Sequence, residues 1–264
     1  MDLLSPIILS LVVTLLSFFL IVLSRLLLDL TPYDRVFWSV MLVIFAVGIL
    51  LCFSRGVWLS LIISVGFLLI NLPHAEQYKR ILIVGSSFVL LLVLLLLPSV
   101  SDLISERIST LFDPQFASNR SRLLRWGQAF LMFVEHPIIG NGYGAFAMLY
   151  QEDASLTGEY VAQFQLGAHS EYMQILAEHG SLGILAWFWL ILIFFRFGVQ
   201  ALRRVKETFF RSLVLGIMAV ELSFFVHFFV NNLLNGDAIG IPFWILYGLL
   251  PAVVGIAERE FEAA

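Results

Sequence analysis

The sequence predicts an all-α membrane protein, a transmembrane helical bundle of about seven spans with one helical extracytoplasmic loop domain. Of the 264 residues, 60% are hydrophobic and only 13% are charged, whereas a soluble domain is about half apolar and about a quarter charged. The apolar residues form blocks of about 18 to 23, the length that crosses a hydrocarbon core of about 30 Å. Composition therefore excludes an ordinary soluble domain.

The apolar blocks predict three parts of the chain. Residues 1–98 should hold four transmembrane helices, 99–181 the loop domain, and 182–264 three more transmembrane helices. The expected spans are about 6–24, 36–53, 57–72, 81–98, 182–200, 212–235 and 240–257.

Basic residues predict the orientation, because lysine and arginine are enriched in short cytoplasmic loops. The 196–211 connection carries five of them and should lie inside the cell. Ten of the fifteen basic residues then lie inside, and residues 99–181 lie outside together with the N-terminus.

The outer segment should begin with a helix that Ser118 or Asn119 caps and that ends near Glu135, since the residue before Pro137 disfavours the helical region. Arg122 and Trp126 are four residues apart, so they share a face and can make a guanidinium–indole contact. The alternative is an interfacial helix whose arginines only meet lipid phosphates.

A glycine-rich turn follows, with Gly140, Gly142 and Gly144. A nucleotide site would need a strand before this pattern and a helix after it, and the pattern instead follows a helix and a proline. We expect the glycines to provide positive φ values and close backbone approach in a packed turn.

His169 should open a second outer helix that Gly180 closes. The positive end of a helix disfavours imidazolium, which leaves a neutral ring able to accept a proton. Glu171 is two residues on and not on the same face, so the pair is a poor metal site. The single cysteine, Cys52, adds no metal or disulfide framework.

Polar residues inside the expected spans are a further functional signal. Glu221 lies near the middle of the sixth span, and His227, Asn231 and Asn235 follow at a spacing of four. Arg55 lies at the outer end of the second span. The alternatives are interhelical hydrogen bonding for the first group and a contact with lipid head groups for Arg55.

In their order along the chain, these motifs resemble the O-antigen ligase and polymerase family, over roughly residues 36–235. The ordered set is specific for the family but not for one member of it. Many relatives have Asn where this chain has Ser170. The matching motifs are Ser54-Arg55-Gly56, Arg122-x-x-x-Trp126, His136-Pro137-x-x-Gly140-x-Gly142-x-Gly144-x-Phe146, Ala168-His169-Ser170-x-Tyr172 and Glu178-x-Gly180-x-x-Gly183.

The resemblance implies a metal-independent, inverting glycosyltransferase of GT-C type, without a cofactor or a nucleic-acid partner. It would lie in the bacterial inner membrane, among membrane lipids, with its active-site loop on the periplasmic side. The donor would be a glycan on polyprenyl diphosphate, such as undecaprenyl diphosphate, and the acceptor lipid A–core or a similar glycan. Family members usually have more spans and a cytoplasmic N-terminus, so this chain would be a C-terminal portion or a shortened homologue.

Carried over by matched position, His169 would be the main catalytic residue. Its rivals for acid–base work are His136, Glu171 and His179, and Glu171 could be the base instead. The chemistry suits these residue types, because guanidinium binds phosphate in a bidentate manner and neutral imidazole is a good base. The diphosphate would be held by Arg55, Arg122 and Arg125. Supporting residues would be Trp126, Gly140, Gly142, Gly144, Tyr172, Glu221 and His227.

Two alternatives stay open on sequence grounds. A polysaccharide polymerase or a protein O-oligosaccharyltransferase of the same family would share these motifs. A non-enzymatic membrane subunit or a transporter belongs to another class, and the absence of paired broken helices in two halves argues against the transporter.

Overall fold

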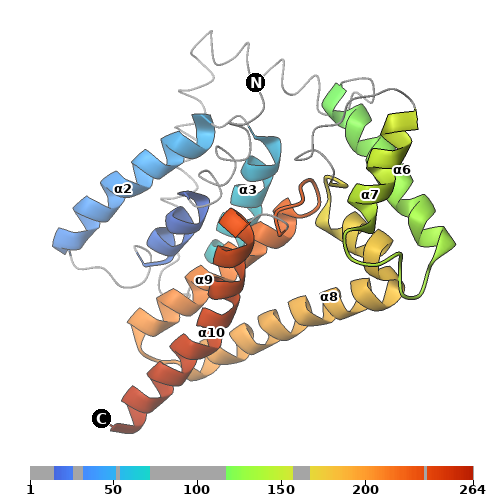
Figure 1. Ribbon diagram of the computed structural model, residues 1–264. Coiled ribbons are helices and arrows are strands. Elements are labelled where there is room, and N and C mark those ends of the chain that lie inside the picture. The colour runs from blue at the N-terminus through green and yellow to red at the C-terminus, as the bar shows by residue number, and fades with distance from the viewer. Residues whose placement is uncertain are drawn as a thin grey trace.

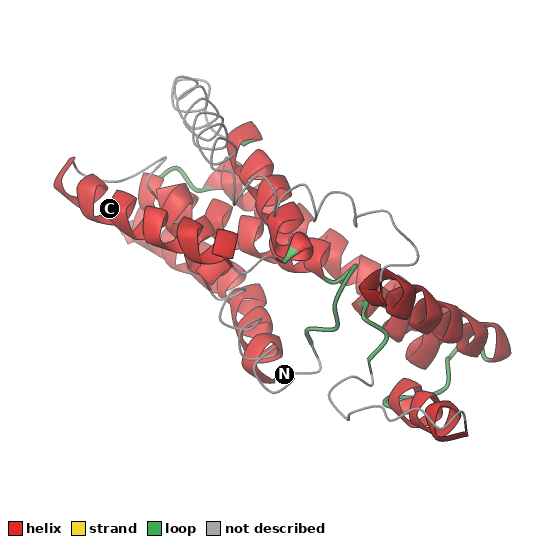
Figure 2. Cartoon of the chain, turned by 90° about the horizontal axis from the view of Figure 1, so that it is seen from above, coloured by secondary structure: helices red, strands yellow, loops and turns green. Residues whose placement is uncertain are grey.

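Figure 1 shows the computed structural model, which describes residues 15–25, 32–51, 54–71, 117–156, 167–234 and 237–263. Within these ranges every regular element is a helix, and loops join the helices in the view from above (Figure 2). The predicted all-α class is confirmed. The expected span at 81–98 lies outside the described residues.

Three described helices are long and apolar enough to cross a membrane, so this is a membrane protein. They are α8 (Glu171–Arg204), α9 (Thr208–His227) and α10 (Asp237–Ala263), the last with its apolar part at Ile239–Phe261. Shorter apolar helices cover Leu15–Arg25, part of α2 (Pro32–Leu51) and part of α3 (Arg55–Ile70). Each overlaps an expected span, and the total of seven stays a prediction.

Helix α9 lies at the centre of the apolar helices, with α3, α8 and α10 packed against it (Figure 1). In the most apolar 18-residue stretch of α9, 67% of the stretch is buried inside the protein, compared with 17% for the corresponding stretch of α8. Phe224 of α9 and Phe228, the residue directly after this helix, contact Phe243 of α10, with ring centroids 5.6 and 5.4 Å apart. Helices in lipid associate through side-chain packing and hydrogen bonds. In this protein α9 is the helix against which the others pack.

Two shorter helices, α6 (Ala117–Glu135) and α7 (Ala145–Leu156), pack against the beginning of α8. A second, small core lies between them, with Phe146 and Met132 as its largest members. The outer face of α6 stays apolar, with Leu124 and Leu131 exposed. Such a face is what a helix lying on a membrane surface requires.

Two helix boundaries near these elements differ from the expected ones. Helix α6 already includes Ala117, so Ser118 and Asn119 lie inside it and do not cap it. Its end at Glu135, before His136-Pro137, is as predicted. Helix α8 runs on to Arg204, so the basic connection to α9 contains only residues 205–207. Hydropathy marks the apolar part of a helix, and charged turns that continue it are missed.

Helix α9 ends at His227, eight residues before the expected end of the sixth span. Asn231 is therefore not on the helix, although its Nδ2 folds back to 2.6 Å from His227 Nε2. Asn235 lies outside the described residues. The helix stops here because the carbonyl of Phe228, which would accept from the next turn of α9, instead accepts from Glu171 N of α8 at 2.8 Å.

Candidate active site

The site is built around His169, directly before α8. Ser170 is the N-cap of the helix, and its Oγ accepts a hydrogen bond from Met173 N at 3.4 Å. The helix therefore begins at Glu171, and His169 precedes it with a φ of +52°, the one positive value outside glycine among the described residues. The left-handed region costs an L-residue about 1–2 kcal/mol. Neighbouring contacts must therefore hold His169 in place.

Hydrogen bonds on both sides of His169 supply this support. Ala168 N donates to Gln174 Oε1 at 3.3 Å, and Ser170 N donates to Asn232 Oδ1 at 3.2 Å. A side chain on Gly167 would collide with Asn232, since its Cβ would lie 2.9 Å from Oδ1. The strained residue is thus held between the first turn of α8 and the loop after α9.

Two arginines of α6 lie beside this segment. Arg122 and Arg125 are three residues apart and share a face of the helix. Arg125 is buried, its Nη1 donates to Gly167 O at 3.0 Å, and its guanidinium lies 5.1 Å from the centroid of the Tyr150 ring. Arg122 is close enough to act electrostatically on both His169 and His227.

This environment lowers the pKa of His169 from 6.5 to about 4. Burial of the ring contributes most, followed by the positive charges of Arg125 and then Arg122. The neutral imidazole expected from the sequence is therefore present. Partial burial and the two guanidinium groups cause this shift, because a partly buried cation beside positive charge is unfavourable. The contribution expected from the helix terminus stays a prediction.

Glu171 and Tyr172 connect the start of α8 to the end of α9. The Glu171 Oε2 atom accepts from Leu233 N at 3.1 Å and from Leu234 N at 3.4 Å. The Tyr172 hydroxyl donates to Phe225 O at 2.8 Å. Both side chains are buried. The carboxylate is thus engaged with backbone that follows α9 and has little freedom to move toward a substrate.

The glycine-rich turn docks into a break in α8. Gly180 has non-helical angles, φ 63° and ψ −159°, within the long helix. One helical segment ends at Gly180 as predicted, and a second segment continues α8 beyond this kink. The carbonyls of Ala177 and Glu178 accept from Asn141 N and Gly142 N at 3.1 and 2.8 Å. In return, Ser181 N donates to the carbonyl of Pro137 at 2.8 Å.

The positive φ values expected at the three glycines are confirmed, at 72° for Gly140, 98° for Gly142 and 78° for Gly144. They do not have equal surroundings. A Cβ on Gly140 would overlap the backbone of Glu178, whereas one on Gly142 would meet nothing within 4 Å. Close backbone approach is therefore needed at Gly140 alone among these three positions.

This difference gives a test of the docked turn. Gly140→Ala should lower the thermal stability of the purified full chain clearly more than Gly142→Ala. Both changes strain a positive φ, by about 1–2 kcal/mol, but only the first also forces the turn away from α8. Equal melting temperatures for the two variants would contradict the close packing.

Sequence reasoning did not single out Glu178 as a site residue. It is buried, and its Oε1 accepts from Gln174 Nε2 at 3.3 Å and from Phe146 N at 3.4 Å. It thus connects the first turns of α8 to the first turn of α7. The sequence feature that could have identified Glu178 is its position two residues before Gly180, because a carboxylate just before a helix break can accept hydrogen bonds from free N–H groups.

The other predicted site residues lie at varying distances from His169. His227 is buried at the end of α9, and a Cβ on Gly56 of α3 would lie 3.4 Å from its Nε2 atom. Arg55 precedes Gly56 as the first residue of α3, and its side chain is outside the described residues. Glu221 lies six residues before His227, about 9 Å along the axis, and is completely buried in α9.

Trp126 lies on α6, and within the described ranges its buried Nε1 has no hydrogen-bond partner. Its contact with Arg122 stays a prediction. Among the described residues, no three His, Cys, Asp or Glu side chains gather as a metal site would require. The structure thus brings together His169, Arg122, Arg125 and His227, and it places α3 next to them through Gly56.

A family model described as O-antigen ligase matches residues 40–188, more than half of the chain. This chain belongs to the O-antigen ligase family. The match contains α3, α6, α7 and the first half of α8, and so all of the site except the end of α9 and the loop that follows it. A comparison with curated proteins finds no match. The resemblance seen in the motifs is confirmed, and membership indicates glycan ligation at a membrane.

Proposed function

We propose that this protein transfers a glycan from polyprenyl diphosphate to an acceptor hydroxyl, with lipid A–core as the ligase-type acceptor. The observation that carries the proposal is the neutral His169 held beside two arginines. Such a transfer needs a base for the acceptor hydroxyl and positive charge for the departing diphosphate. A neutral imidazole and guanidinium groups are suited to these two tasks.

In the proposed reaction, His169 takes the proton of the acceptor hydroxyl as that oxygen attacks the anomeric carbon. The new glycosidic bond forms while the bond from this carbon to the diphosphate oxygen breaks, which inverts the configuration. The diphosphate keeps the electron pair of the broken bond. Arg122, and Arg55 at the start of α3, stabilise its charge.

Arg125 and Glu171 receive positioning roles in this proposal. The guanidinium of Arg125 is already engaged with Gly167 O and the Tyr150 ring, so it holds the backbone before His169. Glu171 is engaged with Leu233 and Leu234 and fixes the start of α8. With the orientation predicted from basic residues, the reaction takes place on the outer face of the bacterial inner membrane.

Acceptor choice tests the proposal. The full chain is placed in liposomes with a glycan on polyprenyl diphosphate as donor. In separate reactions the acceptor is lipid A–core, a second lipid-linked glycan, or a hydroxyl-bearing polypeptide. Glycan on lipid A–core supports the ligase, and longer lipid-linked glycan indicates a polymerase. Glycan on the polypeptide indicates a protein O-oligosaccharyltransferase. If the chain is well folded and no product forms with any acceptor, the result would favour a non-enzymatic subunit.

The pH profile of transfer should reflect the lowered pKa of His169. Its folded value of about 4 lies below the ordinary 6.5, so the ring stays a neutral base as pH falls through 6 and 5. We expect kcat/KM to be flat between pH 5 and 7 and to decline near pH 4. A decline centred on pH 6.5 would show that the base is exposed or is a different group.

A further inference from the structure

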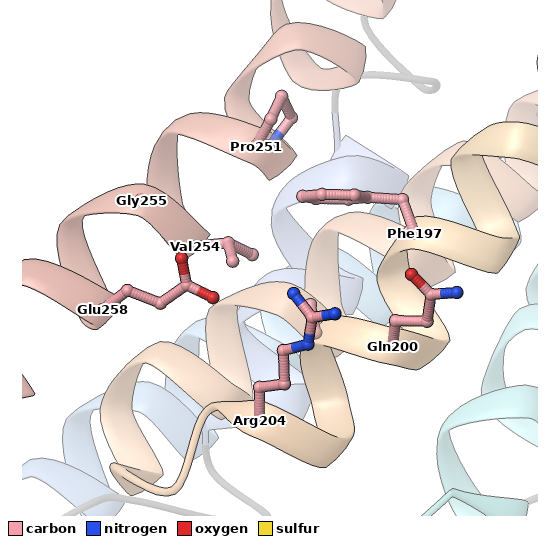
Figure 3. Close-up of a pocket in the computed structure, with 8 residues that line it drawn as sticks. Phe197, Gln200, Arg204, Pro251, Val254, Gly255 and Glu258 are labelled. Carbon is pink, nitrogen blue, oxygen red and sulfur yellow. The ribbon is translucent and has the colours of Figure 1, made fainter.

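Two adjoining pockets lie between α8 and α10, at the end of α8 opposite to His169. Figure 3 shows the first of them. Their volumes are about 130 and 260 Å³, and Arg204 of α8 and Glu258 of α10 line both. We call the two together the α8–α10 groove. Helix α8 has 34 residues and is about 50 Å long, so the groove is separate from the candidate active site.

One wall of the groove is apolar, and part of it is formed by small residues. Phe197 of α8 faces Pro251, Val254 and Gly255 of α10 (Figure 3). Pro251 and Gly255 are one turn apart and carry little bulk. A Cβ on Gly255 would meet no atom within 4 Å. The space between these two candidate membrane spans is therefore open and suited to a hydrocarbon chain.

The rim of the groove carries both signs of charge. The Arg204 guanidinium and the Glu258 carboxylate point toward one another across it (Figure 3), yet no hydrogen bond or ion pair joins them in the described part of the chain. Lys206 lines the second pocket, with its Nζ 5.6 Å from the centroid of the Phe261 ring. Glu207 also lines it, but its carboxylate caps α9 by accepting from Phe210 N at 2.9 Å.

We propose that the α8–α10 groove binds a membrane phospholipid with a zwitterionic aminophosphate head group. Its phosphate contacts Arg204 and Lys206, its ammonium contacts Glu258, and one acyl chain lies along Phe197 and Val254. A lipid whose head group is only anionic would leave Glu258 facing like charge. The groove therefore prefers phosphatidylethanolamine over phosphatidylglycerol.

The head-group preference can be measured by native mass spectrometry. The full chain is taken from vesicles with equal amounts of the two lipids, carrying identical acyl chains. We expect phosphatidylethanolamine to be enriched about two- to fivefold, the range of one exposed ion pair. Glu258→Gln should abolish this preference, and Glu260→Gln, exposed on the same helix outside the groove, should retain it. Equal retention of both lipids by the wild type would overturn the proposal.

Occupancy can be tested by filling the groove. Gly255→Leu should displace the bound lipid without colliding with the protein, whereas Gly248→Leu is the matched control. Gly248 is exposed on α10 outside the groove, and a Cβ there also meets nothing within 4 Å. Equal lipid retention by the two variants would overturn the proposal. So would a dimer that covers this face in place of lipid. If Gly255→Leu fails to fold, the Glu258 comparison decides alone.

Discussion

His169→Ala should nearly abolish glycan transfer by the complete protein, with a loss of about 10²- to 10⁴-fold for a general base. The imidazole is neutral, because burial and two guanidinium groups keep its pKa at about 4. The histidine within α8, His179, lacks this environment: it is exposed, with its ring centroid 6.4 Å from that of Tyr143. Transfer is measured in cells lacking a second copy, at matched membrane abundance of the protein.

Two controls separate the ring of His169 from its backbone. His179→Ala should cost much less transfer. His169→Gly removes the same ring but adopts a φ of +52° without strain, so it should be as inactive as His169→Ala. Recovery in the glycine variant would show that the alanine variant failed through its backbone. Near-full transfer by His169→Ala would make the histidine structural and pass the base role to Glu171.

Arg122→Lys should reduce transfer about 10- to 100-fold despite the retained charge, the magnitude of one hydrogen bond to a charged group. Lysine is a point charge and cannot reproduce the bidentate contact of guanidinium with a diphosphate. Arg122 is the arginine to change, because Arg125 is buried, lies over the Tyr150 ring and donates to the carbonyl of Gly167. Initial rates with a polyprenyl-diphosphate glycan measure the effect.

Arg120→Lys is the matched control for this change, since Arg120 is exposed two residues earlier on α6. It should transfer at nearly the wild-type rate. A similar loss in both variants would point to the general charge of α6 and not to a clamp. Full activity of Arg122→Lys would remove Arg122 from the proposed diphosphate site.

The sequence alone determined the class of the protein and the order of its motifs. Membrane-length apolar runs predict spans wherever they occur, because unpaired backbone groups are costly in lipid. His136-Pro137 predicted the end of α6, and three alternating glycines predicted a turn with positive φ values. These features depend on neighbours in the chain, so local pattern is sufficient to predict them.

Only the tertiary structure decided how the site is held together. Glu171 reads as a candidate base in the sequence, but its carboxylate accepts from Leu233 N, 62 residues away. Helix α9 ends early because the loop after it pairs with the start of α8, and α8 kinks where the 137–142 turn takes its free carbonyls. His169 is neutral because elements distant in sequence partly bury it beside Arg125 and Arg122. Each of these facts depends on long-range contacts, which local propensity and hydropathy do not contain.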